Sequence, residues 1–195
     1  MTTIDKTMRA DARRNREKLL KAAAALFAAE GTDVSLEAVA KRAGVGIGTL
    51  YRHFPTRDAL IAETYRNEVD HVAEGADELL AALPPDQAME EWLERFIVYV
   101  AAKRGMSDAL KSMSLSREQL FPEARRRIGA TLDTLLAAGV QAGTIRPDVT
   151  ADDVYRATMA IWNIPDGDDW VDQARTVLRL LMDGLRYGAR VDASR

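Results

Sequence analysis

Hydrophobic residues recur with a helical period along most of the chain, and the clearest example lies between Ser35 and Phe54. Two short stripes follow each other there: Leu36, Val39, Ala40 and Ala43, and then Ile47, Leu50, Tyr51 and Phe54. The spacing i, i+3, i+4, i+7 places residues on one face of an α-helix. Gly44 favours a left-handed end to the first helix, and Pro55 limits the second. The pattern therefore predicts two short helices joined by a glycine turn.

The ends of this helix pair are also specified by sequence. Ser35 is the expected N-cap of the first helix, because its hydroxyl can accept a bond from a first-turn amide. The second helix is so short that packing on its neighbours must hold it. Gly48 lies inside that helix at a cost of about 1 kcal/mol relative to alanine. A glycine there suits a position that another helix, or DNA, approaches closely.

Longer stripes predict helices on both sides of the pair. We expect a flexible basic arm followed by a helix from about Ala12 to Glu30, which Gly31 ends. We expect another helix from Thr56 to Leu83, before Pro84-Pro85. Because no glycine-rich stretch interrupts this second helix, we interpret it as a continuous rigid lever.

The remaining sequence predicts a helical bundle. A stripe from Met89 ends near Gly105, a looser segment covers 106–121, and a long helix follows to Gly143. Thr150, with Asp153 three residues later, predicts a capped helix that ends at Ile164. A last helix is expected from about Asp169 to Ala189.

The sequence as a whole predicts an all-α protein. No strand-like alternation and no internal repeat stands out. We expect about nine helices, divided between a three-helix helix-turn-helix head in 1–57 and a C-terminal helical bundle in 58–195.

Charge is distributed unevenly between these two parts. The 195-residue chain has a net charge of −3, but residues 1–60 contain 11 Lys and Arg against 7 Asp and Glu, which gives +4. The remainder contains 16 against 23, which gives −7. Seven of the basic residues lie between Lys6 and Lys21. A basic head on an acidic body is typical of a protein that binds DNA through one end, although a solubilising charged face would look similar.

Composition narrows the class of protein further. The chain is 47% hydrophobic and 29% charged, as expected of a globular protein with a substantial core. It contains no cysteine, which excludes disulfides and thiolate metal sites. No signal peptide and no apolar run of about 18 residues is visible, so we expect a cytoplasmic protein without membrane contact.

The face of the second short helix opposite its apolar stripe is the candidate site. It carries Gly46, Thr49, Arg52 and His53, which are small or polar. Such a face could enter the major groove of DNA as a recognition helix does, or could simply be solvated. Periodicity alone leaves both interpretations open.

At these residues the chain resembles the TetR family of bacterial transcriptional regulators. The run A-x-x-A-G-V-x-x-G-T-L-Y-x-H-F begins at Ala40, and a basic residue follows at Arg57. The resemblance is close over roughly 13–61, and beyond that only helix lengths and order are similar. Gly46 stands where many members have serine, which removes a hydroxyl contact, and Arg57 stands where many have lysine, which keeps the charge.

The resemblance implies a ligand-responsive repressor that binds a pseudo-palindromic operator as a homodimer. It points to Thr49, Tyr51 and His53 as contact residues. We expect Thr49 and Arg52 at base edges, Tyr51 and His53 at phosphates, and Arg57 and the helix start at Ser35 in positioning the DNA backbone. Since Tyr51 also lies on the apolar stripe, its ring could belong to the core.

Two further sites are expected in the C-terminal bundle. The last two helices should form the dimer interface through Ile161, Trp162, Leu178, Leu181 and Leu185, although these residues could equally close the core of one chain. A pocket for a small, mainly apolar effector is expected at Trp92, Phe96, Met106, Leu110, Met113 and Phe121. Methionines suit varied ligands, but they also fill ordinary cores.

Catalysis is the weaker alternative. Glu68-x-x-His71 has the spacing of half a di-iron site, but the second half is missing from the sequence. The adjacent acidic pairs lie at expected helix starts, where they complement the helix dipole. We therefore predict no catalytic residues, metal or cofactor. A helical small-molecule-binding module without operator function is the stronger alternative. The feature that distinguishes a DNA-binding regulator from such a module is the basic head with Thr49, Tyr51 and His53.

Overall fold

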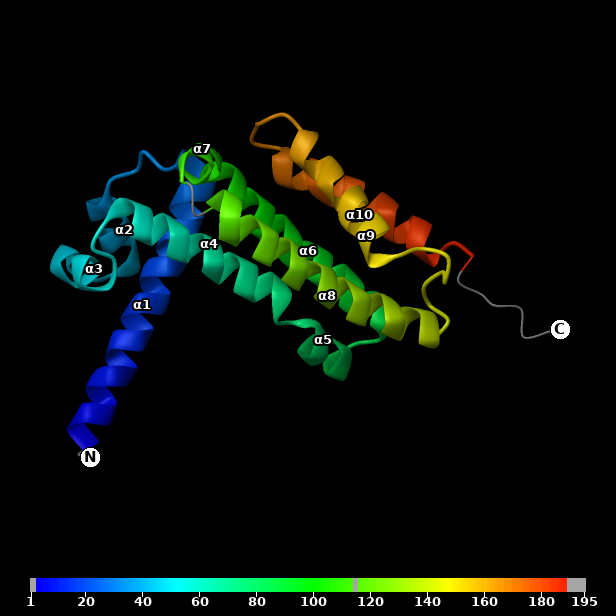
Figure 1. The fold of residues 1–195 in the computed structure, drawn as a ribbon, viewed down its shortest axis with the longest axis horizontal. Coiled ribbons are helices and arrows are strands. Elements are labelled where there is room, and N and C mark those ends of the chain that lie inside the picture. Colours follow the sequence, from blue (N-terminus) through cyan, green and yellow to red (C-terminus); the bar gives the residue numbers. More distant parts are fainter. Residues whose placement is uncertain (1–2, 114–115, 189–195) are drawn as a thin grey trace. The chain divides into compact units, whose positions relative to one another are not determined.

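A computed structural model describes residues 3–113 and 116–188, and every regular element in this part of the chain is helical. The elements, in order, are α1 (Thr3–Glu30), α2 (Leu36–Ala43), α3 (Ile47–His53), α4 (Arg57–Ala73), α5 (Ala76–Ala82), α6 (Pro85–Gly105), α7 (Ser107–Ser112), the π-helical turn η1 (Ser116–Leu120), α8 (Phe121–Gln141), α9 (Ala151–Thr158), the 3₁₀ turn η2 (Met159–Asn163) and α10 (Trp170–Arg186) (Figure 1). The expected all-α class is confirmed. Leu115 and Ala189, which belonged to two of the expected elements, lie outside the described residues.

The described residues form two compact units. The first lies within 1–68 and 101–120, and the second within 69–100 and 121–195. Residues 58–68 and 101–120 thus group with the N-terminal helices. The expected division of function at residue 57 stays a prediction.

The first unit is built around the C-terminal half of α1. Packing begins at Leu19 and continues through Ala23 and Phe27, which are fully buried. Before Leu19, most side chains from Asp11 onwards are exposed. Contrary to the expected flexible arm, the helix already begins at Thr3. It ends as expected, because Gly31 has a φ of 76° and donates its amide to the carbonyl of Phe27.

Gly105 brings the end of α6 into the first unit. A Cβ atom at this position would overlap the backbone carbonyl of Phe27 in α1. Only a residue without a side chain permits this close approach. The sequence indicated Gly105 as a helix end, and the structure adds an interhelical contact.

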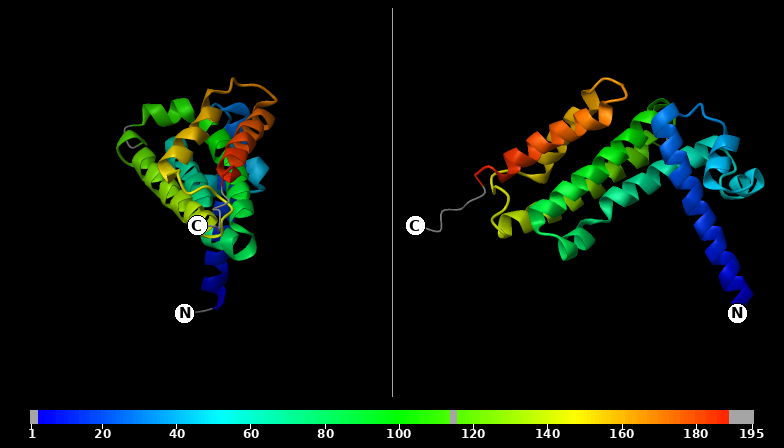
Figure 2. Two further views of the ribbon diagram at one scale, coloured as in Figure 1. Left: turned by 90° about the vertical axis from the view of Figure 1, so that its right-hand side faces the viewer. Right: turned by 180° about the vertical axis from the view of Figure 1, so that it is seen from behind.

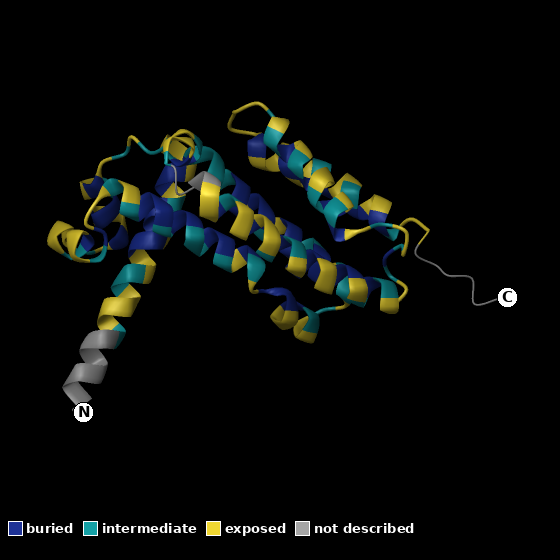
Figure 3. Ribbon diagram, in the orientation of Figure 1, coloured by how far each residue is buried: buried dark blue, intermediate teal, exposed yellow. Residues whose placement is uncertain are grey.

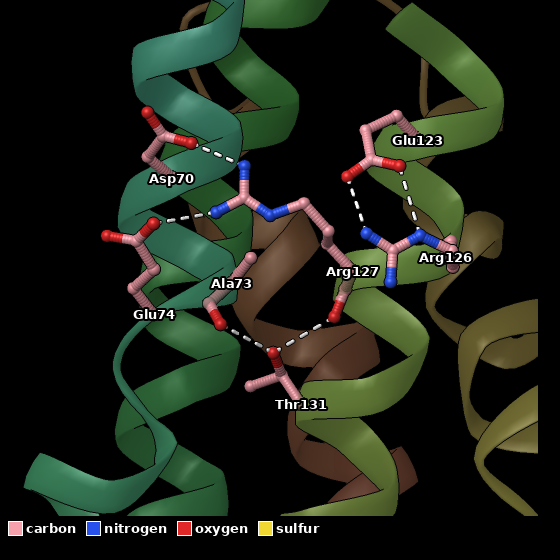
Figure 4. A network of polar contacts seen from close by, with 7 residues as sticks. All are labelled: Asp70, Ala73, Glu74, Glu123, Arg126, Arg127 and Thr131. Atoms are coloured by element: carbon pink, nitrogen blue, oxygen red, sulfur yellow. Dashed lines mark hydrogen bonds and ion pairs between the residues drawn. The ribbon is translucent and has the colours of Figure 1, made fainter. Parts of the chain in front are cut away.

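The expected continuous helix from Thr56 to Leu83 is wrong. α4 ends at Ala73, and Gly75 is the N-cap of the separate α5. The last carbonyls of α4 find partners on other helices: Trp92 Nε1 donates to the carbonyl of Val72 at 2.7 Å, and the Thr131 hydroxyl donates to that of Ala73 at 2.8 Å (Figure 4). Side chains thus replace the hydrogen bonds that a continuing helix would supply.

Ion pairs from α8 hold the same end of α4. Arg127 contacts the carboxylates of Asp70 and Glu74, the latter at 2.8 Å (Figure 4). The hydrogen bond to Asp70 is the main reason that the pKa of Arg127 is raised. On the solvent side of α8, Arg126 pairs with Glu123 instead.

The second unit also contains α9 and α10, which lie side by side (Figure 2). The predicted capped start of α9 is confirmed: the amide of Asp153 donates to the Thr150 hydroxyl, and the Asp153 carboxylate accepts from the amide of Thr150. The helix ends earlier than expected, at Thr158, and continues as the 3₁₀ turn η2. α10 buries Ala174, Leu178, Met182 and Leu185.

Candidate nucleic-acid interface

The turn between α2 and α3 has the geometry that its sequence predicts. The Ser35 hydroxyl accepts a hydrogen bond from the amide of Ala38 at 3.1 Å, which caps α2. Gly44 ends α2 with a φ of 68°, a left-handed conformation that glycine adopts without strain. Gly46 is the N-cap of α3 and provides no side-chain hydrogen bond. The two helices are therefore joined by two glycines with Val45 between them.

α3 is anchored by fewer residues than expected. Leu50 and Phe54 are buried, at 0% and 1% exposure, but Ile47 and Tyr51 are 37% and 47% exposed. The proposed core role of the Tyr51 ring is therefore wrong. The buried stripe of this seven-residue helix is narrow, and most of the helix faces solvent (Figure 3).

The exposed side of α3 carries most of the expected contact residues. Gly46 and Arg52 are exposed, whereas Thr49 and His53 are half-buried. A Cβ atom at Gly46 or Gly48 would meet nothing within 4 Å. The backbone of α3 is therefore open to an approaching molecule at these two glycines.

Arg57 and Ser35 are already engaged within the chain. The Arg57 guanidinium donates from Nη1 to the carbonyl of Val34 at 2.8 Å and also to that of Thr32. The Ser35 hydroxyl serves as the N-cap of α2. These contacts join the start of α4 to the segment that leads into α2.

Arg16 forms a second tie within the head. Its guanidinium lies 5.5 Å from the centre of the Phe54 ring and pairs with Glu63 of α4. Glu63 also pairs with Arg66. Arg16, one of the basic residues between Lys6 and Lys21, therefore supports the C-terminal end of α3 through contacts within the chain.

Other cations of the head remain free. Lys18 and Lys21 of α1, and Lys41 and Arg42 of α2, are exposed, and no ion pair or side-chain hydrogen bond engages them within the described residues. Lys41 and Arg42 were not among the expected contact residues. Their position in the last turn of α2, opposite the apolar stripe, was the signal that could have identified them.

The expected dimer residues fall into two groups. Ile161, Leu178 and Leu185 are buried within the single chain, at 3% exposure or less. Trp162 and Leu181 are half-buried. The neighbouring Leu180 and Tyr187 are 68% and 80% exposed. Exposed apolar side chains therefore lie on α10 and at its C-cap, close in sequence to the expected dimer residues.

The expected pocket residues are mostly packed. Trp92 and Phe96 are fully buried and stack on each other with ring centres 5.4 Å apart, and Met106 and Leu110 are also at 0% exposure. Phe121 is half-buried. Met113 lines a cavity of about 500 Å³ with Ser112 and residues of α4: Asp58, Ala59, Ala62, Glu63 and Arg66. The cavity lining is more polar than the expected site.

A second cavity, of about 580 Å³, lies between α6 and α10. Leu93, Ile97, Leu178 and Met182 line it, and ion pairs join its two helices: Arg175 to Glu94, and Arg186 to Asp86 and Glu90. The hydrogen bonds that Arg186 donates to Glu90 and Asp86 raise the pKa of Arg186. The charged side chains that line this cavity are therefore largely paired with each other.

Within the described ranges, no group of three or more His, Cys, Asp and Glu side chains is placed to hold a metal ion. Of the expected half-site, Glu68 is buried and His71 is exposed. None of the helices in the described part of the chain combines the length and apolar character needed to cross a membrane.

Both the N-terminal and the C-terminal part of the chain match models of known protein families. Residues 19–64 match the family model of bacterial regulatory proteins of the tetR family, and residues 84–187 match the model of the SbtR-like transcriptional regulator C-terminal domain. An HTH-type transcriptional regulator of Staphylococcus aureus is 39% identical over 64 residues. That segment covers 32% of this chain and 35% of that protein, so the match spans about a third of this curated relative.

Two solved structures are similar over nearly their whole length. A TetR transcriptional regulator from Streptomyces coelicolor is 44% identical with a TM-score of 0.81, covering 88% of this chain and 98% of that one. A TetR transcription regulatory protein from Mycobacterium vanbaalenii is 38% identical with a TM-score of 0.74, covering 92% and 99%. With the head and the C-terminal part both matched, the chain belongs to the TetR family of bacterial transcriptional regulators.

Proposed function

We propose that this regulator binds a pseudo-palindromic operator as a homodimer and represses transcription by occupying it. α3 is the recognition helix of this proposal, and a two-fold axis relates two copies on successive major grooves. The family consists of DNA-binding regulators, and no catalytic role is proposed.

The open backbone of α3 carries this proposal. Gly48 costs stability inside a helix, yet within the described residues nothing approaches its Cβ position. Close intramolecular packing therefore does not account for this glycine. An external surface that must come close to the helix, such as the floor of the major groove, accounts for it better.

The contact roles carry over from the family resemblance of these residues, and Tyr51 and Arg52 are also exposed. Arg52 and Thr49 are the candidates for base edges, and Tyr51 and His53 are the candidates for phosphates. Lys41 and Arg42 are added as phosphate contacts, because they are exposed cations without an intramolecular partner among the described residues. The start of α2 at Ser35 offers backbone amides to a phosphate.

Selection of bound duplexes from a random DNA library tests operator binding directly. The wild-type protein should enrich one palindromic sequence. Replacing Thr49 by Ala should change the preferred sequence, whereas Lys41→Met with Arg42→Met should weaken binding to all sequences and reduce its salt dependence. Enrichment of the same duplexes by a Thr49→Ala, Tyr51→Phe, His53→Ala variant, with wild-type affinity, would contradict the assignment of α3.

We further propose that a small, mainly apolar effector lowers operator affinity. Its candidate position is the cavity beside α4 that Met113 lines, because α4 directly follows α3. The lining of Ala59 and Ala62 offers apolar contact, and Glu63 and Arg66 indicate that the effector also carries a polar group. By linkage, operator DNA must weaken effector binding by the same factor.

A thermal-shift screen of small hydrophobic compounds, followed by operator titration with each hit, tests this proposal. Ala59→Phe should fill the cavity and abolish the shift, while Ala137→Phe on the exposed side of α8 should leave it unchanged. A hit that still binds Ala59→Phe would place the effector elsewhere. A hit that leaves operator affinity unchanged would show that its site is not the switch.

A further inference from the structure

Arg57 occupies an unusual position for a residue expected to bind phosphate. It is the first residue of α4 and is half-buried, and its Nη1 donates to the carbonyls of Thr32 and Val34. An arginine Nη1 carries two N–H groups. Both donors of this nitrogen are thus directed at the protein backbone.

The two carbonyls belong to the short connection between α1 and α2. Gly31 ends α1, and Ser35 caps α2 directly after Val34. Arg57 therefore holds the segment that fixes where α2 begins. Its own helix begins in a similar way, because the Thr56 hydroxyl accepts from the amide of Ala59 at 3.1 Å.

This contact closes a ring that is formed by α2, α3 and α4. Gly44 to Gly46 connects α2 to α3, Phe54 to Thr56 connects α3 to α4, and Arg57 connects α4 back to the start of α2. α3 has only seven residues, of which Leu50 is buried, so it cannot fix its own orientation. A rigid bridge between its two neighbours, α2 and α4, can fix the orientation of α3.

We propose that Arg57 acts in operator binding as a positioning residue that fixes the orientation of α3, and not as a phosphate contact. The inference rests on the proposed operator-binding function. Arginine suits this role because its planar guanidinium presents its donors in a fixed geometry, whereas a lysine ammonium is a point charge on a flexible stem.

Salt dependence separates the two roles. Each phosphate contact contributes about 0.9 to the slope of log affinity against log salt. Arg42 is a matched control, because it is an exposed arginine of α2 that is proposed as a phosphate contact and that no side-chain contact engages within the described residues. The probe is the highest-affinity duplex that the wild-type protein enriches from a random library, titrated over a range of KCl concentrations.

Arg57→Met should lower operator affinity about tenfold, because two charge-assisted hydrogen bonds are lost, and should keep the wild-type salt slope. Arg42→Met should reduce the slope by about 0.9. Arg57→Lys keeps the charge but not the guanidinium geometry, so its operator affinity should stay below that of the wild type. Amide exchange at Ala38, which the Ser35 cap protects, should accelerate in Arg57→Met, while amides of α8 should exchange as in the wild type.

Opposite results would overturn the inference. A slope that falls in Arg57→Met as it does in Arg42→Met, or full affinity in Arg57→Lys, assigns Arg57 to a phosphate. Unchanged operator affinity in Arg57→Met would show that Arg57 neither positions α3 nor contacts a phosphate. If the wild-type protein enriches no duplex, the proposed function itself fails, which is a different outcome from a wild type that binds while Arg57→Met behaves as a phosphate variant.

Discussion

Gly105 carries the most severe steric constraint at the level of single residues. A side chain there would overlap the carbonyl of Phe27, and that atom belongs to backbone that cannot rotate away. Gly105→Ala should therefore destabilise the protein by about 1 to 3 kcal/mol, the usual cost of overpacking a filled interior. Denaturant unfolding followed by circular dichroism measures this change.

Gly129 provides the matched control. It also lies in a helix, but nothing lies within 4 Å of its Cβ position. Gly129→Ala should be neutral or stabilise the protein by up to about 1 kcal/mol, because alanine is the better helix former and restricts the unfolded chain. Equal destabilisation by both substitutions would mean that the contact with Phe27 is not the cause.

Sequence patterns predicted the roles of some residues well and those of others poorly. Gly44, Ser35 and Gly31 could be assigned because caps depend on local backbone geometry. The carbonyl partners of Arg57 could not be assigned, because Thr32 and Val34 lie 25 and 23 positions away in the chain. The exposure of Ile47 and Tyr51 could not be predicted either. Periodicity places a side chain on a face, but it does not tell how much of that face a neighbouring helix covers.

At the level of elements, helix boundaries that carry a local capping signal were easier to predict than boundaries that depend on distant contacts. Thr150 and Asp153 specify the start of α9 within four residues. The end of α4 instead depends on Trp92 and Thr131, which lie far along the chain and bond its last carbonyls. A sequence without a glycine cluster therefore looked like one continuous helix.

The α9 cap predicts a pH dependence of stability. Hydrogen bonds from Thr150 are the largest cause that lowers the pKa of Asp153 in the folded protein. A lowered pKa contributes stability that is complete above the usual aspartate pKa and is lost as the pH falls through the folded-state value. The free-energy difference between wild type and Asp153→Asn should therefore be larger at about pH 6 than at about pH 3.

Urea unfolding at both pH values measures this difference, and Asp133→Asn is the control. Asp133 is exposed on α8, and no side-chain contact engages it within the described residues. Its substitution should change stability little at either pH. A difference for Asp153→Asn that is the same at both pH values would mean that the carboxylate charge does not contribute to the cap.

For the whole molecule, the fold class, the approximate number of helices and the basic head could all be predicted from sequence. The grouping of 101–120 with the N-terminal helices could not, because it depends on the contact between Gly105 and Phe27. The surface proposed for dimerisation was equally hard to predict from sequence. α10 has apolar residues on two faces, and only the structure distinguishes the buried face from the exposed one.

The exposed face of α10 is the better candidate for the dimer interface. Leu180 and Tyr187 are 68% and 80% exposed, and Leu181 is half-buried beside them. Gly184, with nothing within 4 Å of its Cβ position, lies between them in sequence and would allow another helix to approach closely. Leu178 and Leu185 are buried in the chain, so their substitution would test folding together with assembly.

Leu180→Glu with Tyr187→Glu should therefore convert the proposed homodimer to a folded monomer, because two charges would be buried without partners at the two-fold contact. Sedimentation velocity measures the mass, and circular dichroism verifies that the helices remain. The monomer should also lose operator affinity, since one copy can occupy only one half-site. Val98→Glu is the control, because Val98 is 60% exposed on α6 and should tolerate a charge without dissociation. Dissociation by Val98→Glu, with an intact Leu180→Glu, Tyr187→Glu dimer, would move the interface from α10 to α6.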